Sequence, residues 1–231
     1  MLARDWYYTQ RRQVGLDTAV ASIYDVSEDS DARARQALTM LGVKPGWRIA
    51  DIGCGNGVLA TEAALMGAEV DAIDISPAML GLAEIYARDR KARIRTQPAG
   101  LLSFAYQPNS YDLIVSEFTL HHLPDFWKAV ALSRIFNALK PGANFYLRDM
   151  VFVSMPDGVD RDVEGWADFS IKNHDFERES VMTHMRDEYS TFGWVMERML
   201  TETGFTLVAA DYHAPLHGTY LLRKPTPDEQ I

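Results

Sequence analysis

Short apolar runs alternate with helix-length amphipathic segments along residues 47–150. The runs are rich in β-branched residues, as is typical of strands buried in a parallel sheet, whereas the longer segments repeat apolar residues at helical spacing. Two further apolar runs follow towards the carboxyl terminus. The pattern predicts seven strands, at residues 47–52, 69–74, 94–98, 111–116, 143–152, 205–210 and 219–223.

Helices are predicted between these strands, with capping residues at several of their ends. Gly67 can end the first helix in a left-handed conformation, Ser76 is placed to cap the second, and Pro77 to open it. The predicted helices span residues 58–66, 78–89, 125–139 and 192–203. The alternation predicts an α/β fold: a doubly wound, mostly parallel seven-stranded sheet with helices on both faces.

The chain of 231 residues is long enough for one hydrophobic core and too short for two, so we expect a single domain over residues 1–231. Two segments lie outside the alternating unit: residues 1–31, rich in aromatic residues and arginine, and the charged, aromatic stretch 154–190. Long excursions from such a sheet are usually functional, so we expect these two to form a helical cap over the active site. Residues 45–153 and 191–223 are expected to form the cofactor-binding core.

A glycine turn ends the first predicted strand, with Gly53, Gly55 and Gly57 at alternate positions. Glycine permits positive φ and removes side chains that would meet a ligand, so the turn is either a tight connection or a ligand cradle. Two acids favour the cradle. Asp51 precedes the first glycine, and Asp74 ends the second strand, where it can accept hydrogen bonds from ribose hydroxyls. Because Asp51 would repel a pyrophosphate and the glycine spacing is not G-x-G-x-x-G, a ligand with a cationic group fits better.

These motifs resemble those of the class I S-adenosyl-L-methionine-dependent methyltransferases. Four blocks, in the order and spacing of that family, carry the resemblance: residues 51–57, 70–76, 111–116 and 139–142. The sequence Leu-His-His-Leu-Pro-Asp at residues 120–125 also matches a stretch common in members that act on small molecules. The resemblance implies S-adenosyl-L-methionine as cofactor and methyl transfer to a small-molecule acceptor as the activity.

The resemblance also implies a role for individual residues at the cofactor. The glycine turn would cradle the methionine part, with Asp51 near its ammonium group and Asp74 on the ribose. The further residues expected at the cofactor are Tyr24, Ile75, Met79, Gly100, Leu101 and Ser116. Ile75 and Met79 would flank the adenine. Tyr24 would lie near the methionine end or serve as an aromatic plug.

One departure from the family concerns the adenine amino group. Members often carry an acidic residue soon after the third strand, whereas this chain has Gly100 and Leu101 there. A contact from the backbone would then replace the carboxylate.

Methyl transfer from a sulfonium is an in-line displacement, so the protein has mainly to position the acceptor and exclude water. If the acceptor is a hydroxyl or an activated carbon, a general base helps, and the candidates are His121, His122, His184 and Glu117. One histidine of the adjacent pair would face the ligand while the other caps or packs, and a structural role for either is the alternative.

Charge and spacing argue against other kinds of site. The net charge of −9, without a basic stripe, disfavours a nucleic-acid partner. Arg11, Arg12 and Arg186 would bind an anionic group of the substrate or are simply solvated. No H-x-x-x-H or H-x-x-E pattern occurs, so we expect the histidines and carboxylates not to converge on a metal ion.

Two competing functions share this sheet: an NAD-dependent oxidoreductase, which the glycine spacing and Asp51 disfavour, and a non-catalytic S-adenosylmethionine-binding protein. Use of a modified sulfonium for another group transfer is a minor variant. A single cysteine, Cys54, and the lack of a signal-like or membrane-spanning apolar run predict a cytoplasmic protein without membrane attachment. The methyl acceptor and the oligomeric state are open at this stage.

Overall fold

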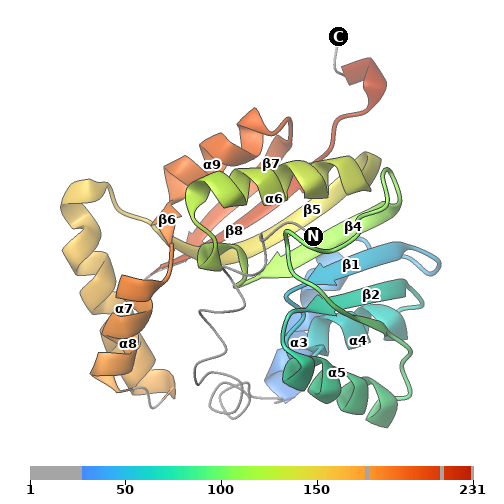
Figure 1. The fold of residues 1–231 in the computed structure, drawn as a ribbon, viewed down its shortest axis with the longest axis horizontal. Helices are drawn as coiled ribbons and strands as arrows, with labels where there is room; N and C mark the ends of the chain where they lie inside the picture. Colours follow the sequence, from blue (N-terminus) through green and yellow to red (C-terminus); the bar gives the residue numbers. More distant parts are fainter. Residues whose placement is uncertain (1–27, 175–176, 214–215, 230–231) are drawn as a thin grey trace.

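A computed structural model describes residues 28–174, 177–213 and 216–229 (Figure 1). One mixed sheet runs through these residues in the order β3-β2-β1-β4-β5-β8-β7, and the short strand β6 pairs with β5 off that path. The strands are β1 (Arg48–Ile52), β2 (Glu69–Asp74), β3 (Arg95–Pro98), β4 (Tyr111–Glu117), β5 (Leu139–Phe152), β6 (Thr191–Phe192), β7 (Thr206–His213) and β8 (His217–Arg223). Strands β1 to β6 pair in parallel, and β8 is antiparallel to both β5 and β7.

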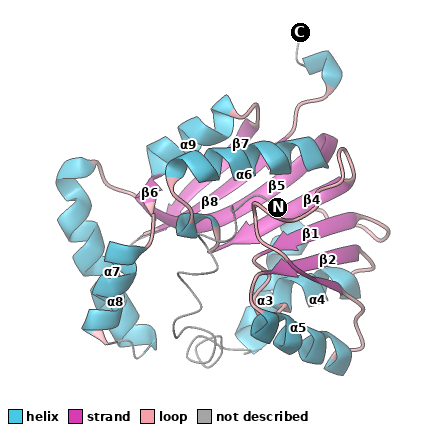
Figure 2. Cartoon of the chain, in the orientation of Figure 1, coloured by secondary structure: helices cyan, strands magenta, loops and turns pink. Residues whose placement is uncertain are grey.

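Helices cover both faces of this sheet (Figure 2). One face packs against α3 (Glu28–Met40), α4 (Val58–Leu65) and α5 (Pro77–Asp89). The other packs against α6 (Asp125–Ala138) and α9 (Gly193–Glu202). Buried side chains alternate between the two cores along each central strand: in β4, Leu113 and Val115 join the first and Ile114 the second. This alternation follows from the twofold periodicity of a strand.

Local sequence signals account for where the helices begin. Ser76 adopts an extended conformation and its side chain accepts a hydrogen bond from the Met79 amide, while Pro77 occupies the first turn of α5. Gly57, in a left-handed conformation, precedes α4. Among the described residues, no helix has the length and apolar character needed to cross a bilayer.

The α/β architecture and all seven predicted strands are confirmed, with two corrections. Strand β6 is an eighth strand of two residues, too short to give a periodic signal. Strand β5 begins at Leu139 rather than at residue 143, because Leu139 already pairs with Tyr111 and the positive φ of Gly142 carries the strand through the proline-glycine step.

The insertion at residues 154–190 is helical, as expected. It contains η2 (Pro156–Gly158), α7 (Val159–His174) and α8 (Arg178–Asp187). Trp166, Ala167 and Val181 from these helices form a separate apolar cluster with Met150 of β5 and with Leu216. The insertion is therefore anchored to the carboxyl end of β5. Residues 1–27, the greater part of the predicted amino-terminal cap, lie outside the described residues.

Gly57→Ala is expected to lower the free energy of unfolding by about 2 kcal/mol or more, because a left-handed backbone and a steric clash both disfavour the new methyl group. Gly57 has φ +77°, and a Cβ there would lie 2.6 Å from the Cβ of Ala83. Gly46→Ala is the matched control, since φ is +80° and no atom lies within 4 Å of the added Cβ. Denaturant unfolding of both variants checks this; equal losses would contradict the packing argument.

Candidate cofactor and acceptor site

The glycine turn lies between β1 and α4 and is fixed by the neighbouring strand. The amides of Gly53 and Cys54 both donate to the carbonyl oxygen of Ile73, at 2.7 and 3.0 Å. Gly53 and Gly55 have φ of +77° and +52°. A Cβ on Gly53 would lie 1.9 Å from Oγ1 of Thr119, whereas a Cβ on Gly55 would meet no atom within 4 Å. The turn is thus closed against the loop after β4 at Gly53 and open at Gly55.

Asp74, at the end of β2, accepts hydrogen bonds from backbone amides of its own loop and of the glycine turn. Its carboxylate accepts from the amide of Gly55 at 3.0 Å and from the amide of Ser76 at 2.8 Å. Its carbonyl oxygen accepts from the amide of Ala99 at 3.1 Å, which brings Gly100 and its neighbours beside the end of β2. The structure therefore brings together three loops that the sequence assigns to the cofactor.

Asp51, in β1, is a buried carboxylate with an unsatisfied oxygen. Only 4% of the residue is exposed, and its Oδ2 has no hydrogen-bond partner among the described residues. Burial, together with the nearby carboxylates of Glu117 and Asp74, raises the pKa of Asp51 to about 8. Burial also raises the pKa of Glu117, which ends β4. A cation placed here would relieve the repulsion between these acids and satisfy the free oxygen.

The other residues expected at the cofactor fall into different settings. Met79 and Leu101 are buried, and Ile75 is half-buried in the loop before α5. Ser116 is fully buried and its hydroxyl donates to the carbonyl oxygen of Ile52 at 3.0 Å, so it ties β4 to β1 within the sheet. Tyr24 lies outside the described residues.

The two adjacent histidines lie in η1 (Leu120–His122), the short helix between β4 and α6. Nδ1 of His121 lies 2.5 Å from Oδ1 of Asp149, and the His121 amide donates to the other carboxylate oxygen at 3.1 Å. Both residues are buried. A carboxylate on Nδ1 fixes the ring orientation and makes Nε2 the nitrogen that points away from Asp149.

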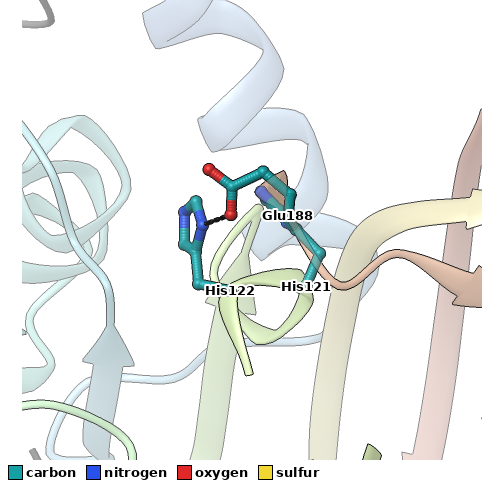
Figure 3. A group of neighbouring side chains, drawn as sticks. All are labelled: His121, His122 and Glu188. Carbon is teal, nitrogen blue, oxygen red and sulfur yellow. Dashed lines mark hydrogen bonds and ion pairs between the residues drawn. The ribbon is translucent and has the colours of Figure 1, made fainter. Parts of the chain in front are cut away.

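His122 is held by a residue far along the chain, Glu188, whose Oε2 hydrogen-bonds to Nδ1 of His122 (Figure 3). The backbone reinforces this pairing, because the amide of Tyr189 donates to the carbonyl oxygen of His121 at 2.8 Å. The buried ammonium group of Lys128 bonds to the Tyr189 carbonyl oxygen and, at 2.7 Å, to Asp125. The end of the insertion is thereby fixed against η1.

Two histidines and a carboxylate lie close together here, which the spacing of the sequence did not indicate. His121, His122 and Glu188 each place one potential ligand atom within 4.8 Å of the others. The spacing rule missed them because the carboxylate belongs to the residue that follows α8, 66 residues later in the chain.

Two functional candidates, Asp149 and Glu188, were absent from the sequence prediction. The available signal for Asp149 is its position next to the apolar end of a predicted strand, residues 150–152. Glu188 gives no comparable signal, since it lies in the stretch 154–190, which is charged along its length.

Several other predicted residues are not brought to this site. Arg186 is exposed and pairs with Asp187 at 3.0 Å. Arg11 and Arg12 lie outside the described residues, as does the side chain of His184 in α8. A shared anion-binding role for the three arginines therefore stays a prediction.

Comparison with known proteins points to one family. Residues 49–142 match the family model of the methyltransferase domain. A ubiquinone biosynthesis O-methyltransferase of Xanthomonas campestris pv. campestris is 33% identical over 105 residues, covering 45% of this chain and 43% of that protein. A 27-O-demethylrifamycin SV methyltransferase of Amycolatopsis mediterranei is 31% identical over 141 residues, covering 59% of this chain and 51% of that protein. The match thus spans about half the length of these curated relatives or less.

The fold agrees with this assignment. The structure of phosphoethanolamine N-methyltransferase 2 of Haemonchus contortus, in complex with S-adenosyl-L-methionine, superposes with a TM-score of 0.70 at 17% identity, covering 98% of this chain and 61% of that chain. Residues 49–142 thus match a methyltransferase domain, and the chain has the fold of S-adenosyl-L-methionine-dependent methyltransferases. The cofactor of this family is S-adenosyl-L-methionine, and the residues present fit it. Asp51 offers an unsatisfied buried carboxylate oxygen for an ammonium group, and the turn at Gly55 leaves space beside it.

Asp51→Asn is expected to change how the stability of the ligand-free protein depends on pH. The folded-state pKa of Asp51, about 8, lies above the ordinary value of 3.8. Its contribution to stability is therefore complete below pH 3.8 and is lost as pH rises through about 8, by at most about 1.4 kcal/mol per pH unit. Thermal unfolding from pH 5 to 9 should show the variant gaining stability relative to the native protein, and parallel curves would contradict the assignment.

Proposed function

We propose that this protein transfers a methyl group from S-adenosyl-L-methionine to a hydroxyl oxygen of a small-molecule acceptor. The observation that carries the proposal is the position of the buried, unsatisfied carboxylate of Asp51 on β1. Strand β1 pairs with β4, and β4 leads directly to His121, which is bound to Asp149. The names of the two curated relatives, both O-methyltransferases of small molecules, support oxygen as the methylated atom.

The cofactor is proposed to lie along the carboxyl ends of β1 and β2. Asp51 binds the ammonium group, and Gly55 lets the backbone of the turn come close to the cofactor. Asp74 accepts hydrogen bonds from the ribose hydroxyls. Met79 and Leu101, both buried beside these loops, provide apolar contacts for the adenine. When bound, S-adenosyl-L-methionine supplies an electrophilic methyl group on a sulfonium.

The acceptor is proposed to lie at the carboxyl ends of β4 and β5, against η1. Thr119 touches Gly53, so the loop that carries the histidines is also in contact with the cofactor turn. A hydroxyl must lose its proton as its oxygen attacks, and His121 and His122 are the polar groups placed to promote that loss. Asp149 and Glu188 position them, while His184 remains a third catalytic candidate.

The surroundings of the histidine pair are suited to exclude water. Phe118, with a positive φ of 50°, follows β4 and packs beside the cluster of Met150 and Trp166. Met182 and Met185 of α8 pack against the same cluster. An apolar cover strengthens electrostatic contacts at the reacting oxygen and favours an acceptor with apolar surface. The insertion at residues 154–190 is thus proposed as the substrate cap.

We further propose a cytoplasmic location and no nucleic-acid partner. The buried free thiol of Cys54 suits a reducing compartment. The net charge of −9 gives little attraction to phosphate backbones.

Asp74→Ala is expected to weaken binding of S-adenosylhomocysteine by about 1 to 3 kcal/mol through lost ribose hydrogen bonds. Gly55→Val is expected to abolish binding, because its side chain would fill the open space at the turn. Calorimetric titration of both variants checks the site, with Gly46→Ala as a left-handed glycine outside it. Native affinity in either variant would contradict the placement of the cofactor.

Asp149→Asn is expected to lower kcat by about 100-fold or more, because His121 loses the partner that orients it. The affinity for S-adenosylhomocysteine should stay unchanged. Asp211→Asn is a matched control, since Asp211 pairs with the exposed His213 at 3.1 Å. Steady-state kinetics of the two variants separate the roles, and equal kcat values would show that Asp149 does not act at the reacting centre.

The proposed activity is tested by incubating the protein with methyl-labelled S-adenosylmethionine and a panel of phenols, vicinal diphenols and aliphatic alcohols, matched by amines and thiols. Label is expected in ether products of the hydroxyl compounds. Transfer only to amines or thiols, or no transfer to any member while the cofactor binds, would contradict it.

A further inference from the structure

The histidine pair and Glu188 bring together side chains of the kinds that bind transition metals. Two imidazoles and one carboxylate place one potential ligand atom each within 4.8 Å of one another, at the point where η1 meets the end of α8 (Figure 3). This set is typical of zinc and related divalent ions, and three protein ligands leave a position open for a further oxygen. The motifs assigned to the cofactor do not include these three side chains, so their proximity is not explained by cofactor binding.

Asp149 supplies the outer contact that metal-bound histidines usually have. Its carboxylate hydrogen-bonds to Nδ1 of His121 at 2.5 Å and also accepts a hydrogen bond from the backbone amide of the same residue. A carboxylate bound to Nδ1 leaves Nε2 as the nitrogen that can coordinate a metal, and it raises the basicity of Nε2. This contact is fully buried, since the Asp149 side chain has no exposed surface.

Burial and charge at the cluster also suit a divalent cation. The side chains of His122 and Glu188 are 8% and 18% exposed, and that of His121 is 3% exposed. The carboxylates of Glu188 and Asp149 bring negative charges next to the two imidazoles. A divalent ion would balance these charges, which matters because an uncompensated charge is costly at a buried site.

The spacing of the donors requires only a local adjustment. Ligand atoms around a tetrahedral zinc ion lie about 3.3 Å apart, given metal-ligand bonds of about 2.0 to 2.2 Å. His122 and Glu188 already face each other across a hydrogen bond. An ion would take the place of the hydrogen in that bond, with Nε2 of His121 as the third ligand.

We propose that His121, His122 and Glu188 bind one divalent transition-metal ion of the zinc type, and that its open position takes the hydroxyl oxygen of the methyl acceptor. The second part of this inference rests on the proposed function. Bound to the ion, the hydroxyl has a lowered pKa and releases its proton to solvent. The oxygen then forms a bond to the methyl carbon as the carbon-sulfur bond breaks, which yields a methyl ether and S-adenosylhomocysteine.

The test is metal titration of the full-length protein after treatment with a chelator. Zn²⁺ is expected to bind with one ion per chain and a micromolar or lower Kd, and Co²⁺ to give visible absorption bands of a low-coordinate nitrogen-oxygen site. His122→Ala and Glu188→Gln should each weaken binding at least 10-fold, and Asp149→Asn about 10- to 100-fold through the outer contact. Glu188→Gln keeps an amide oxygen that can accept from His122, so it is the variant expected to preserve the fold.

His213→Ala and Glu202→Gln are the matched controls, because both residues are exposed, His213 at β7 and Glu202 at the end of α9. They should leave the titration unchanged. No stoichiometric binding by the native protein, or equal loss in the controls, would overturn the metal site. Binding of S-adenosylhomocysteine is measured in the same samples: if it persists without metal binding, the metal inference falls alone, and if it is absent, the proposed function falls whatever the metal titration gives.

Discussion

The carboxylate of Asp74 holds together the two turns from which the cofactor site is built. One oxygen accepts from Gly55 in the first glycine turn, and the other accepts from Ser76 at the start of α5. Parallel pairing of β1 with β2 makes this possible, because it places the carboxyl ends of both strands at one edge of the sheet. The residue expected on the ribose therefore also orders the loops around it. The side chain that orders this edge is thus also the one proposed to recognise the ribose.

Much of the fold follows from the sequence because its signals are local. Strand runs, the cap at Ser76 and the left-handed glycines each act over a few residues, and the structure places them where the pattern predicts. The departures lie where local signals are weak. Strand β6 has two residues, and β5 begins before Pro141 because Leu139 already pairs with Tyr111 of β4, ahead of a shift in register. Tertiary contacts decide such positions.

The residues of the site also fall into those that a local motif predicts and those that only tertiary contacts bring in. Asp51 and the glycine turn are read from one contiguous motif, and the structure gives Asp51 the buried, unsatisfied oxygen that a cationic group needs. The partners of the histidines are not readable in this way. Asp149 comes from β5 and Glu188 from the end of the insertion, 28 and 66 residues away along the chain. No spacing rule connects them, since their proximity is a product of how the insertion packs on the sheet.

We propose that the carboxyl edge of the sheet binds S-adenosyl-L-methionine by its charge as well as by its shape. Burial, together with repulsion from the nearby carboxylates of Glu117 and Asp74, raises the pKa of Asp51 to about 8, and a bound ammonium group would offset this shift. The most direct measurement is calorimetric titration of the purified protein with S-adenosylmethionine, S-adenosylhomocysteine and NADH. The account predicts binding of both sulfur nucleosides, with proton release near neutral pH, and no binding of NADH. Failure of both nucleosides to bind, or preference for NADH, would contradict it.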